Sequence, residues 1–353
     1  MVVSSCAGVT RAGRISGMED RLVFLIGAPR SGTTLLARML AAHSLIHGRA
    51  EPHLLTPLAH LGYYGSVQKA PYDPFNVQQA IHEIVAEIPA GEAGYLAALR
   101  AYADAMYAQL MAAAPPGKRL FLDKTPAYAL VLPFLVKLYP GARYVVLTRH
   151  PLAVLSSYVE SFFDGDYRVA LAHNPILARY VPALADFVRR RPVSLVWVKY
   201  EELVRDPETH FRRVCDYLGI PFEEAAIRYG ERGEEFKGLG DPIGVRQHTE
   251  PVATSVSTWA SKIASNPDTL RVVSRVIDGL DDADLDTLGY SRSTIVAQLE
   301  AARGGPVPVR TKAPLRYRLE RKLLVALRRN IHHNVLGRQL KRVRFALDVI
   351  LRE

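Results

Sequence analysis

Residues 22–36 read LVFLIGAPRSGTTLL, an apolar run that leads directly into a loop of Gly, Ser and Thr. The run predicts a buried strand, and the residues after the loop have the spacing of a helix. A loop in this position presents backbone N–H groups, and the helix N-terminus adds a partial positive charge. Gly27 and Gly32 have the spacing of a Walker A loop, but Thr33 occupies the position of its lysine and Arg30 supplies a cation instead. The stretch therefore predicts a site for a phosphate-like anion and disfavours hydrolysis of ATP or GTP.

Strand and helix patterns alternate along the chain from residue 21 onward. Apolar and β-branched runs predict strands over 22–26, 45–49, 119–122, 143–148 and 193–198. Amphipathic spacing predicts helices over 33–43, 76–88, 93–113, 127–138, 151–163, 175–190 and 208–218. Such alternation favours an α/β fold, a three-layer sandwich with a central parallel sheet and a P-loop-like anion-binding loop. In such a sheet the ligand lies at the carboxyl ends of the strands.

The composition is that of a globular protein, with 49% hydrophobic and 23% charged residues among 353. No run of about eighteen apolar residues occurs, so the sequence predicts no transmembrane helix. Cys6 and Cys215 lie far apart, which disfavours a disulfide framework and favours a cytoplasmic location. Residues 1–20 lack the apolar segment of a signal peptide, and we expect a flexible leader there, before a domain over 21–303.

A basic segment follows this domain. The chain carries 45 Lys or Arg and 35 Asp or Glu, a net charge of +10, and residues 306–353 hold 13 of the basic and 3 of the acidic residues. Residues 304–308, GGPVP, predict a linker, and apolar residues then recur at every fourth position from 315 to 335. The prediction is a basic amphipathic helical tail over 304–353. The tail either docks on its own domain or binds an anionic membrane surface or an acidic carrier, and it lacks a nucleic-acid recognition pattern.

Two segments carry a resemblance to a known family. Residues 29–34, PRSGTT, resemble the 5′-phosphosulfate loop of sulfotransferases, which use 3′-phosphoadenosine 5′-phosphosulfate (PAPS) and release PAP. Residues 149–158, RHPLAVLSSY, resemble the segment in which an arginine and a serine hold the 3′-phosphate, here Arg149 and Ser157. A guanidinium suits this role because it can contact a phosphate through two N–H groups. The resemblance implies a PAPS-dependent sulfotransferase, most similar to the carbohydrate and tyrosyl-protein enzymes, whose phosphosulfate loop comprises Arg30, Ser31, Gly32, Thr33 and Thr34.

Two further segments extend this resemblance. Residues 193–222 resemble a segment of the same family that consists of a strand, a YEEL turn and a helix that ends at LGIPF. The resemblance places Tyr200 near the adenine. Residues 240–248, GDPIGVRQH, resemble a loop that closes over the nucleotide and precedes a helix with a tryptophan. From this loop either Arg246 or His248 would reach the 3′-phosphate.

The chemistry of sulfuryl transfer needs a base for the acceptor proton and a cation for the leaving oxygen, and it requires no metal. Glu51 follows the second expected strand and resembles the base of the carbohydrate and tyrosyl-protein enzymes. His53 is the alternative base, because the small-molecule enzymes use a histidine. Lys124 follows the strand over 119–122 and resembles a lysine whose ammonium lies beside the bridging oxygen, together with Arg30. We expect the glutamate and the lysine to face the sulfur from opposite sides.

Other classes of function stay open on the sequence alone. A nucleotide or metabolite kinase would use Arg30 in place of the Walker lysine and Asp123 as a Mg²⁺ ligand, and a PAP-binding module would bind without catalysis. The acceptor is also open: a glutamate base favours saccharide, peptidyl or natural-product hydroxyls, and aromatic residues within 52–115 are candidates for lining its pocket. The expected partners are therefore a small-molecule or glycan acceptor and no nucleic acid, with a homodimer left undecided.

Overall fold

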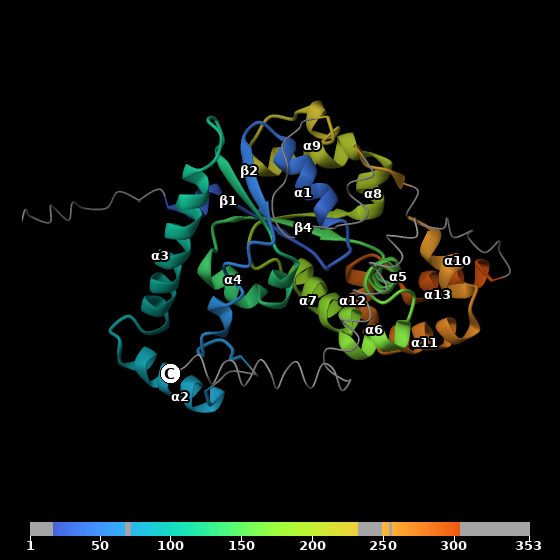
Figure 1. Ribbon diagram of the computed structural model, residues 1–353, viewed down its shortest axis with the longest axis horizontal. Helices are drawn as coiled ribbons and strands as arrows, with labels where there is room; N and C mark the ends of the chain where they lie inside the picture. Colours follow the sequence, from blue (N-terminus) through green and yellow to red (C-terminus); the bar gives the residue numbers. More distant parts are fainter. Residues whose placement is uncertain (1–16, 68–71, 232–248, 254–255, 304–353) are drawn as a thin grey trace, which may run out of the picture.

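The computed structural model describes residues 17–67, 72–231, 249–253 and 256–303 (Figure 1). The predicted basic tail, most of the predicted leader and Arg246 lie outside these residues. No helix within them has both the length and the apolar character needed to cross a membrane.

Five strands form one sheet at the centre of the described part of the chain (Figure 1). They are β1 (Leu22–Ile26), β2 (Ile46–Ala50), β3 (Leu120–Lys124), β4 (Arg143–Thr148) and β5 (Leu195–Lys199). Their order across the sheet is β2-β3-β1-β4-β5, and all neighbouring strands are parallel, which confirms the predicted α/β fold with a central parallel sheet. Since all five strands run in the same direction, their carboxyl ends meet at one edge, where the loop after β1 lies.

Side chains on the two faces of the sheet build two separate cores. Successive strand residues point to opposite faces, so Val23 and Leu25 belong to one core and Phe24 and Ile26 to the other. The helices on the first face are α1 (Thr33–Ala42), α8 (Tyr200–Arg205) and α9 (Pro207–Leu218). Those on the second face are α3 (Gly91–Ala112), the 3-10 helix η3 (Pro126–Leu130), α4 (Leu132–Leu138) and α7 (Ile176–Arg190) (Figure 1). This arrangement is the predicted three-layer sandwich.

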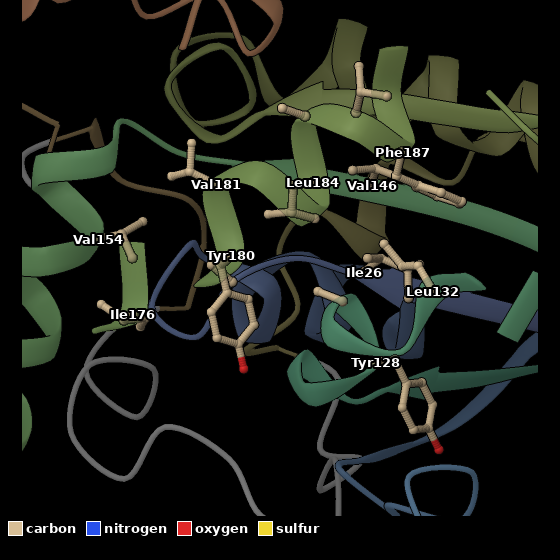
Figure 2. Close-up of a cluster of buried hydrophobic side chains, with 14 of the residues drawn as sticks. Ile26, Tyr128, Leu132, Val146, Val154, Ile176, Tyr180, Val181, Leu184 and Phe187 are labelled. Atoms are coloured by element: carbon tan, nitrogen blue, oxygen red, sulfur yellow. The ribbon is translucent and has the colours of Figure 1, made fainter. Parts of the chain in front are cut away.

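Figure 2 shows how the second core holds α7 against the sheet. Ile26 of β1 and Val146 of β4 belong to the same buried cluster as Leu184 and Phe187 of α7. Burial of apolar surface contributes about 25 cal/mol per Å², so this cluster is a main source of stability for the layer.

The remaining helices flank the sandwich. They are η1 (Met18–Arg21), η2 (Leu58–His60), α2 (Pro74–Glu87), α5 (Pro151–Phe162), α6 (Tyr167–His173), η4 (Glu224–Ala226), α10 (Thr258–Ala264), α11 (Pro267–Asp278), α12 (Asp282–Thr287) and α13 (Arg292–Ala301). The C-terminal helices pack on earlier ones, α10 on α5 and α12 on α7, so they enlarge the helical layer beside the end of β4 (Figure 1).

Several predicted boundaries differ from the structure. The predicted helix over 127–138 is two helices, η3 and α4, because Pro133 has no N–H to continue a helical ladder and instead lies in the first turn of α4. Strand β3 extends to Lys124, past the predicted end at residue 122, and β5 begins at Leu195. The sequence patterns do not predict α6 and α8, which are short helices of 7 and 6 residues.

Residues 18–20, expected to belong to a flexible leader, pack on the domain. Met18 is buried, and the Glu19 carboxylate accepts hydrogen bonds from Arg100 Nη2 and from the Gly141 N–H, each at 2.7 Å. This segment therefore belongs to the folded domain.

Candidate active site

The loop between β1 and α1 has the backbone geometry of an anion cradle. Gly32 caps the N-terminus of α1 with φ of +95°, a conformation that glycine adopts without strain. A Cβ on Gly32 would lie 2.3 Å from Cδ2 of Tyr200, and a Cβ on Gly27 would lie 2.6 Å from the carbonyl oxygen of Leu147. The first N–H groups of α1 have no acceptor within the helix, so this end attracts an anion.

The hydroxyl residues of the loop differ in exposure. Ser31 and Thr33 are buried, and Ser31 Oγ donates to the carbonyl oxygen of Ala28 at 2.8 Å. Thr34 is partly exposed at the start of α1. The structure thus places the predicted loop residues at the edge of the sheet where the strands end.

Two arginines and a serine meet beside this loop. Arg30 Nε donates to Ser157 Oγ at 3.1 Å, and Arg149 Nη1 donates to the carbonyl oxygen of Arg30 at 3.1 Å. The Arg149 guanidinium lies 4.3 Å from the centroid of the Tyr200 ring, and burial lowers the pKa of Arg149. Arg30 has φ of +70°, which a residue with a side chain keeps only where its surroundings fix it. Arg30 of the loop therefore contacts both residues predicted for the 3′-phosphate, Arg149 and Ser157, and the two guanidinium groups concentrate positive charge.

Lys124 and Glu51 form an ion pair at the same edge. Nζ of Lys124 lies 2.8 Å from Oε1 of Glu51 and 3.5 Å from Oγ1 of Thr34. The Lys124 side chain is fully buried, and 26% of the Glu51 side chain is exposed. Nε2 of His53 lies 3.8 Å from Oε2 of Glu51. Lys124 thus connects the anion loop to the carboxylate.

This ion pair corrects the prediction that Glu51 and Lys124 face a sulfur atom from opposite sides. A nitrogen and an oxygen 2.8 Å apart leave no room for an atom of a substrate between them. The reason is strand order: β2 and β3 are neighbours with Ala50 opposite Lys124, and the Glu51 N–H donates to the Lys124 carbonyl oxygen at 2.7 Å. The two side chains therefore leave the sheet side by side.

Asp123, next to Lys124 in β3, is enclosed by hydroxyl groups. Oδ2 accepts hydrogen bonds from Tyr107 at 2.7 Å and from Tyr128 at 3.0 Å, and Oδ1 accepts one from Thr125 at 2.7 Å. Burial raises the pKa of Asp123 to about 6, although these hydrogen bonds act in the opposite direction. Because both oxygens are engaged, this carboxylate is not available as the Mg²⁺ ligand that the kinase alternative needs. Among the described residues, no group of three His, Cys, Asp or Glu side chains is placed to hold a metal ion.

A small pocket lies beside the loop. Ser31, Thr148 and Arg149 supply its polar lining, and apolar residues of α5 and α7 supply most of the rest. Tyr200 is buried beneath the Arg149 guanidinium, and a contact of Tyr200 with an adenine stays a prediction. Arg246 and the alternative His248 lie outside the described residues.

The start of α5, the helix that carries Ser157, is held by a cluster that local sequence patterns do not identify. The His150 N–H donates to Oε1 of Glu201 at 2.8 Å, and the Tyr290 hydroxyl donates to Oε2 of Glu201 at 2.8 Å. The His150 ring stacks on Trp259 with centroids 4.2 Å apart, and burial lowers the pKa of His150 to about 4. Glu201 and Tyr290 are 89 positions apart, so no motif signals their contact.

Residues 23–224 match the model of the sulfotransferase family. The chain is 32% identical over 315 residues to the nodulation protein NoeE of Sinorhizobium fredii, an alignment that covers 83% of this chain and 70% of that protein. It is 24% identical over 258 residues to protein-tyrosine sulfotransferase 1 of Danio rerio, covering 69% of this chain and 66% of that protein. Among solved structures, the sulfotransferase domain of the Synechococcus olefin synthase is 27% identical, with a TM-score of 0.48, over 74% of this chain and 95% of that domain.

The family match extends from β1 to the first residue of η4, so it includes the anion loop, the Glu51–Lys124 pair and the Arg149 segment. It favours sulfuryl transfer over the kinase alternative, in agreement with the missing Walker lysine and the enclosed Asp123. The chain belongs to the sulfotransferase family.

Proposed function

We propose that this protein transfers a sulfuryl group from PAPS to an acceptor hydroxyl, with Glu51 as the general base and Lys124 as the cation for the leaving oxygen. The observation that carries the proposal is the position of the Lys124 ammonium, 2.8 Å from the Glu51 carboxylate and 3.5 Å from the Thr34 hydroxyl. One buried ammonium thus lies between the anion loop and a partly exposed carboxylate, which is where a group-transfer reaction needs its cation.

The residues fit a donor with two separate anionic groups. The loop with Arg30 and the N-terminus of α1 offer N–H donors to one group, while Arg149 and Ser157 offer donors to the other. PAPS carries a phosphosulfate and a 3′-phosphate, and when bound it supplies the activated sulfuryl group. A magnesium nucleotide would instead need a lysine at the position of Thr33.

The ion pair suggests how the two catalytic residues cooperate. Glu51 would accept the proton of the acceptor hydroxyl as that oxygen attacks. Protonation of Glu51 removes the charge that holds the Lys124 ammonium, which then becomes available to the negative charge on the leaving oxygen. His53, within 3.8 Å of Glu51 and with 42% of its side chain exposed, is the alternative base.

The proposed acceptor is a hydroxyl of a saccharide, a peptide or a natural product. Several relatives are named protein-tyrosine sulfotransferases, which supports tyrosine-containing peptides as one class to test. The aromatic residues of 52–115 give less support to an acceptor pocket, because several of them pack on each other or are buried. Tyr63 packs on Tyr64 and Tyr95 with ring centroids 5.0 and 5.3 Å apart, and Tyr107 is buried. These four rings therefore favour a role in packing, and the acceptor class rests on the glutamate base and on the named relatives.

We also propose a cytoplasmic location, and the binding of an anionic membrane surface or an acidic carrier by residues 304–353. The low number of cysteines, two, supports the location, and the basic charge of residues 306–353 supports the binding. Cell fractionation tests the first, and the truncation in the Discussion tests the second.

Two experiments test the proposed reaction. In isothermal titration calorimetry, PAP is expected to bind without Mg²⁺ and more tightly than Mg-ATP, and equal binding of the two ligands would contradict the proposal. In transfer assays, radiolabelled PAPS is incubated with oligosaccharides, tyrosine-containing peptides and hydroxylated natural products. Label is expected in at least one class, and Lys124→Ala is expected to slow its appearance.

A further inference from the structure

We propose that Asp123 and Tyr128 are positioning residues for the turn over 51–55, which carries Glu51 and His53. The inference rests on the proposed role of Glu51 as base. Asp123 does not face the reacting groups itself, because neighbouring residues of a strand point to opposite faces of the sheet and Lys124 points toward Thr34. It acts through Tyr128, which lies in η3 on the other face.

The turn has an unusual backbone that needs support from its surroundings. Glu51 has φ of +54° and His53 has φ of +53°, and neither is a glycine. Residues with a Cβ occupy this left-handed region only where neighbouring contacts fix them, and such positions cluster at functional sites. The direction of the Glu51 carboxylate therefore depends on what anchors the turn.

The turn has one anchor at each end. At its start, the Glu51 N–H donates to the Lys124 carbonyl oxygen at 2.7 Å, an extension of the pairing between β2 and β3. At its end, the Leu55 N–H donates to the Tyr128 hydroxyl oxygen at 3.1 Å, and this bond is buried.

Asp123 determines the direction of the second anchor. Its Oδ2 accepts the Tyr128 proton at 3.0 Å, so the lone pairs of the Tyr128 oxygen face the Leu55 N–H. Figure 2 shows the Tyr128 ring beside the apolar cluster with its hydroxyl directed away from it. A buried carboxylate thus orders a hydroxyl, and the hydroxyl holds the end of the turn.

Tyr107 provides a matched control within the same network. Its hydroxyl donates to the same Oδ2 atom at 2.7 Å, and both tyrosines are buried. Tyr107 lies on α3, and among the described residues its hydroxyl bonds to Asp123 and not to the turn. Removing either hydroxyl takes one donor from Asp123, but only the loss of the Tyr128 hydroxyl releases Leu55.

The test compares Tyr128→Phe with Tyr107→Phe in the full chain. Turnover of labelled PAPS by Tyr128→Phe is expected to fall about 10–100-fold, because displacement of a reacting group by about 1 Å can cost up to about 10²-fold. Its KM for PAPS and its affinity for PAP are expected to stay near wild type, since Arg30, Arg149 and Ser157 have no part in the turn. Tyr107→Phe is expected to keep near-wild-type turnover, although both variants lose stability.

A second readout needs no substrate. Hydrogen exchange at the Leu55 amide is expected to accelerate in Tyr128→Phe and in Asp123→Asn, but not in Tyr107→Phe. Equal turnover in wild type and Tyr128→Phe, or an equal loss in the two tyrosine variants, would overturn the inference. If the wild type sulfates no acceptor, the proposed function fails instead, and an unchanged Leu55 exchange rate in Tyr128→Phe would then separately refute the anchor.

Discussion

Replacing Glu51 with glutamine separates the two roles that the structure gives this residue. The glutamate is the proposed base, and it is also the ion-pair partner of the buried Lys124. Glutamine has nearly the same shape and keeps an oxygen that can accept the Lys124 hydrogen bond, but it cannot take up a proton from an acceptor hydroxyl. We expect a large loss of turnover with a smaller loss of stability.

The expected magnitudes differ enough to be told apart. A positioned general base contributes about 10²–10⁴-fold in rate, so turnover of Glu51→Gln should fall by about that factor. Removal of one partner of a buried ion pair costs about 3–5 kcal/mol, but 26% of the Glu51 side chain is exposed and glutamine keeps one hydrogen bond. The expected loss in the free energy of unfolding is therefore about 1.5–3 kcal/mol, which is the contribution of one hydrogen bond to a charged group.

The assay measures turnover of labelled PAPS, PAP affinity and the free energy of unfolding for three proteins. They are Glu51→Gln, Lys124→Gln and the double variant. In the double variant both charges are gone, so its stability should recover relative to the sum of the single variants while turnover stays low. PAP affinity should stay near wild type in Glu51→Gln, because the carboxylate does not contact Arg30 or Arg149 in the structure.

Full turnover by Glu51→Gln would refute the role of base and leave Glu51 as the structural partner of Lys124. If His53→Ala then abolishes turnover with PAP affinity unchanged, the base is the histidine that lies 3.8 Å from Glu51.

Four further outcomes follow from the same structure. Arg149→Ala should weaken PAP binding about 10–100-fold by calorimetry, from the loss of one hydrogen bond to a charged group, and unchanged affinity would remove it from the 3′-phosphate site. Gly32→Ala should abolish PAP binding in the same assay, because its φ is +95° and its Cβ would lie 2.3 Å from Tyr200; a variant that binds normally would disprove the tight fit. As pH rises from about 4 to about 6, the free energy of unfolding should fall by roughly 3 kcal/mol, because Asp123 has a pKa of about 6 in the folded protein and near 3.9 in the unfolded chain, which therefore loses the proton more readily. The free energy of unfolding of Asp123→Asn should not show this change. Deletion of residues 306–353 should leave PAP affinity intact and reduce binding to phosphatidylserine vesicles, and an unfolded product would favour a tail that completes the core.

The parts of the site that the sequence predicts are those encoded by neighbouring residues. The apolar run over 22–26 and the glycines after it specify a strand, a tight loop and a helix start in one continuous segment, so their geometry follows from local chemistry. The same holds for Arg149 and Ser157, because Arg149 lies two residues before α5 and Ser157 lies within it, so that one short segment carries both. The parallel sheet follows from the alternation of patterns.

The parts that the sequence does not predict depend on which distant segments become neighbours. Glu51 and Lys124 are 73 positions apart and meet because β2 lies beside β3, an order that no local pattern encodes. The left-handed backbone at Glu51 and His53 also has no local signal, since neither residue type requires it. Asp123 did carry a signal, a charged residue directly after the apolar residues Leu120–Leu122 of β3, but its two tyrosine partners come from α3 and η3.

The contacts of the Glu201 carboxylate limit where this domain can be truncated. The family match ends at residue 224, whereas Glu201 is held by Tyr290 and the neighbouring His150 is covered by Trp259. A fragment that stops at residue 224, where the family model stops, would keep the anion loop yet expose the buried start of α5 to water. The end of the family model and the end of the packed domain therefore fall at different places in this chain, and a stable fragment has to include the helices up to α13.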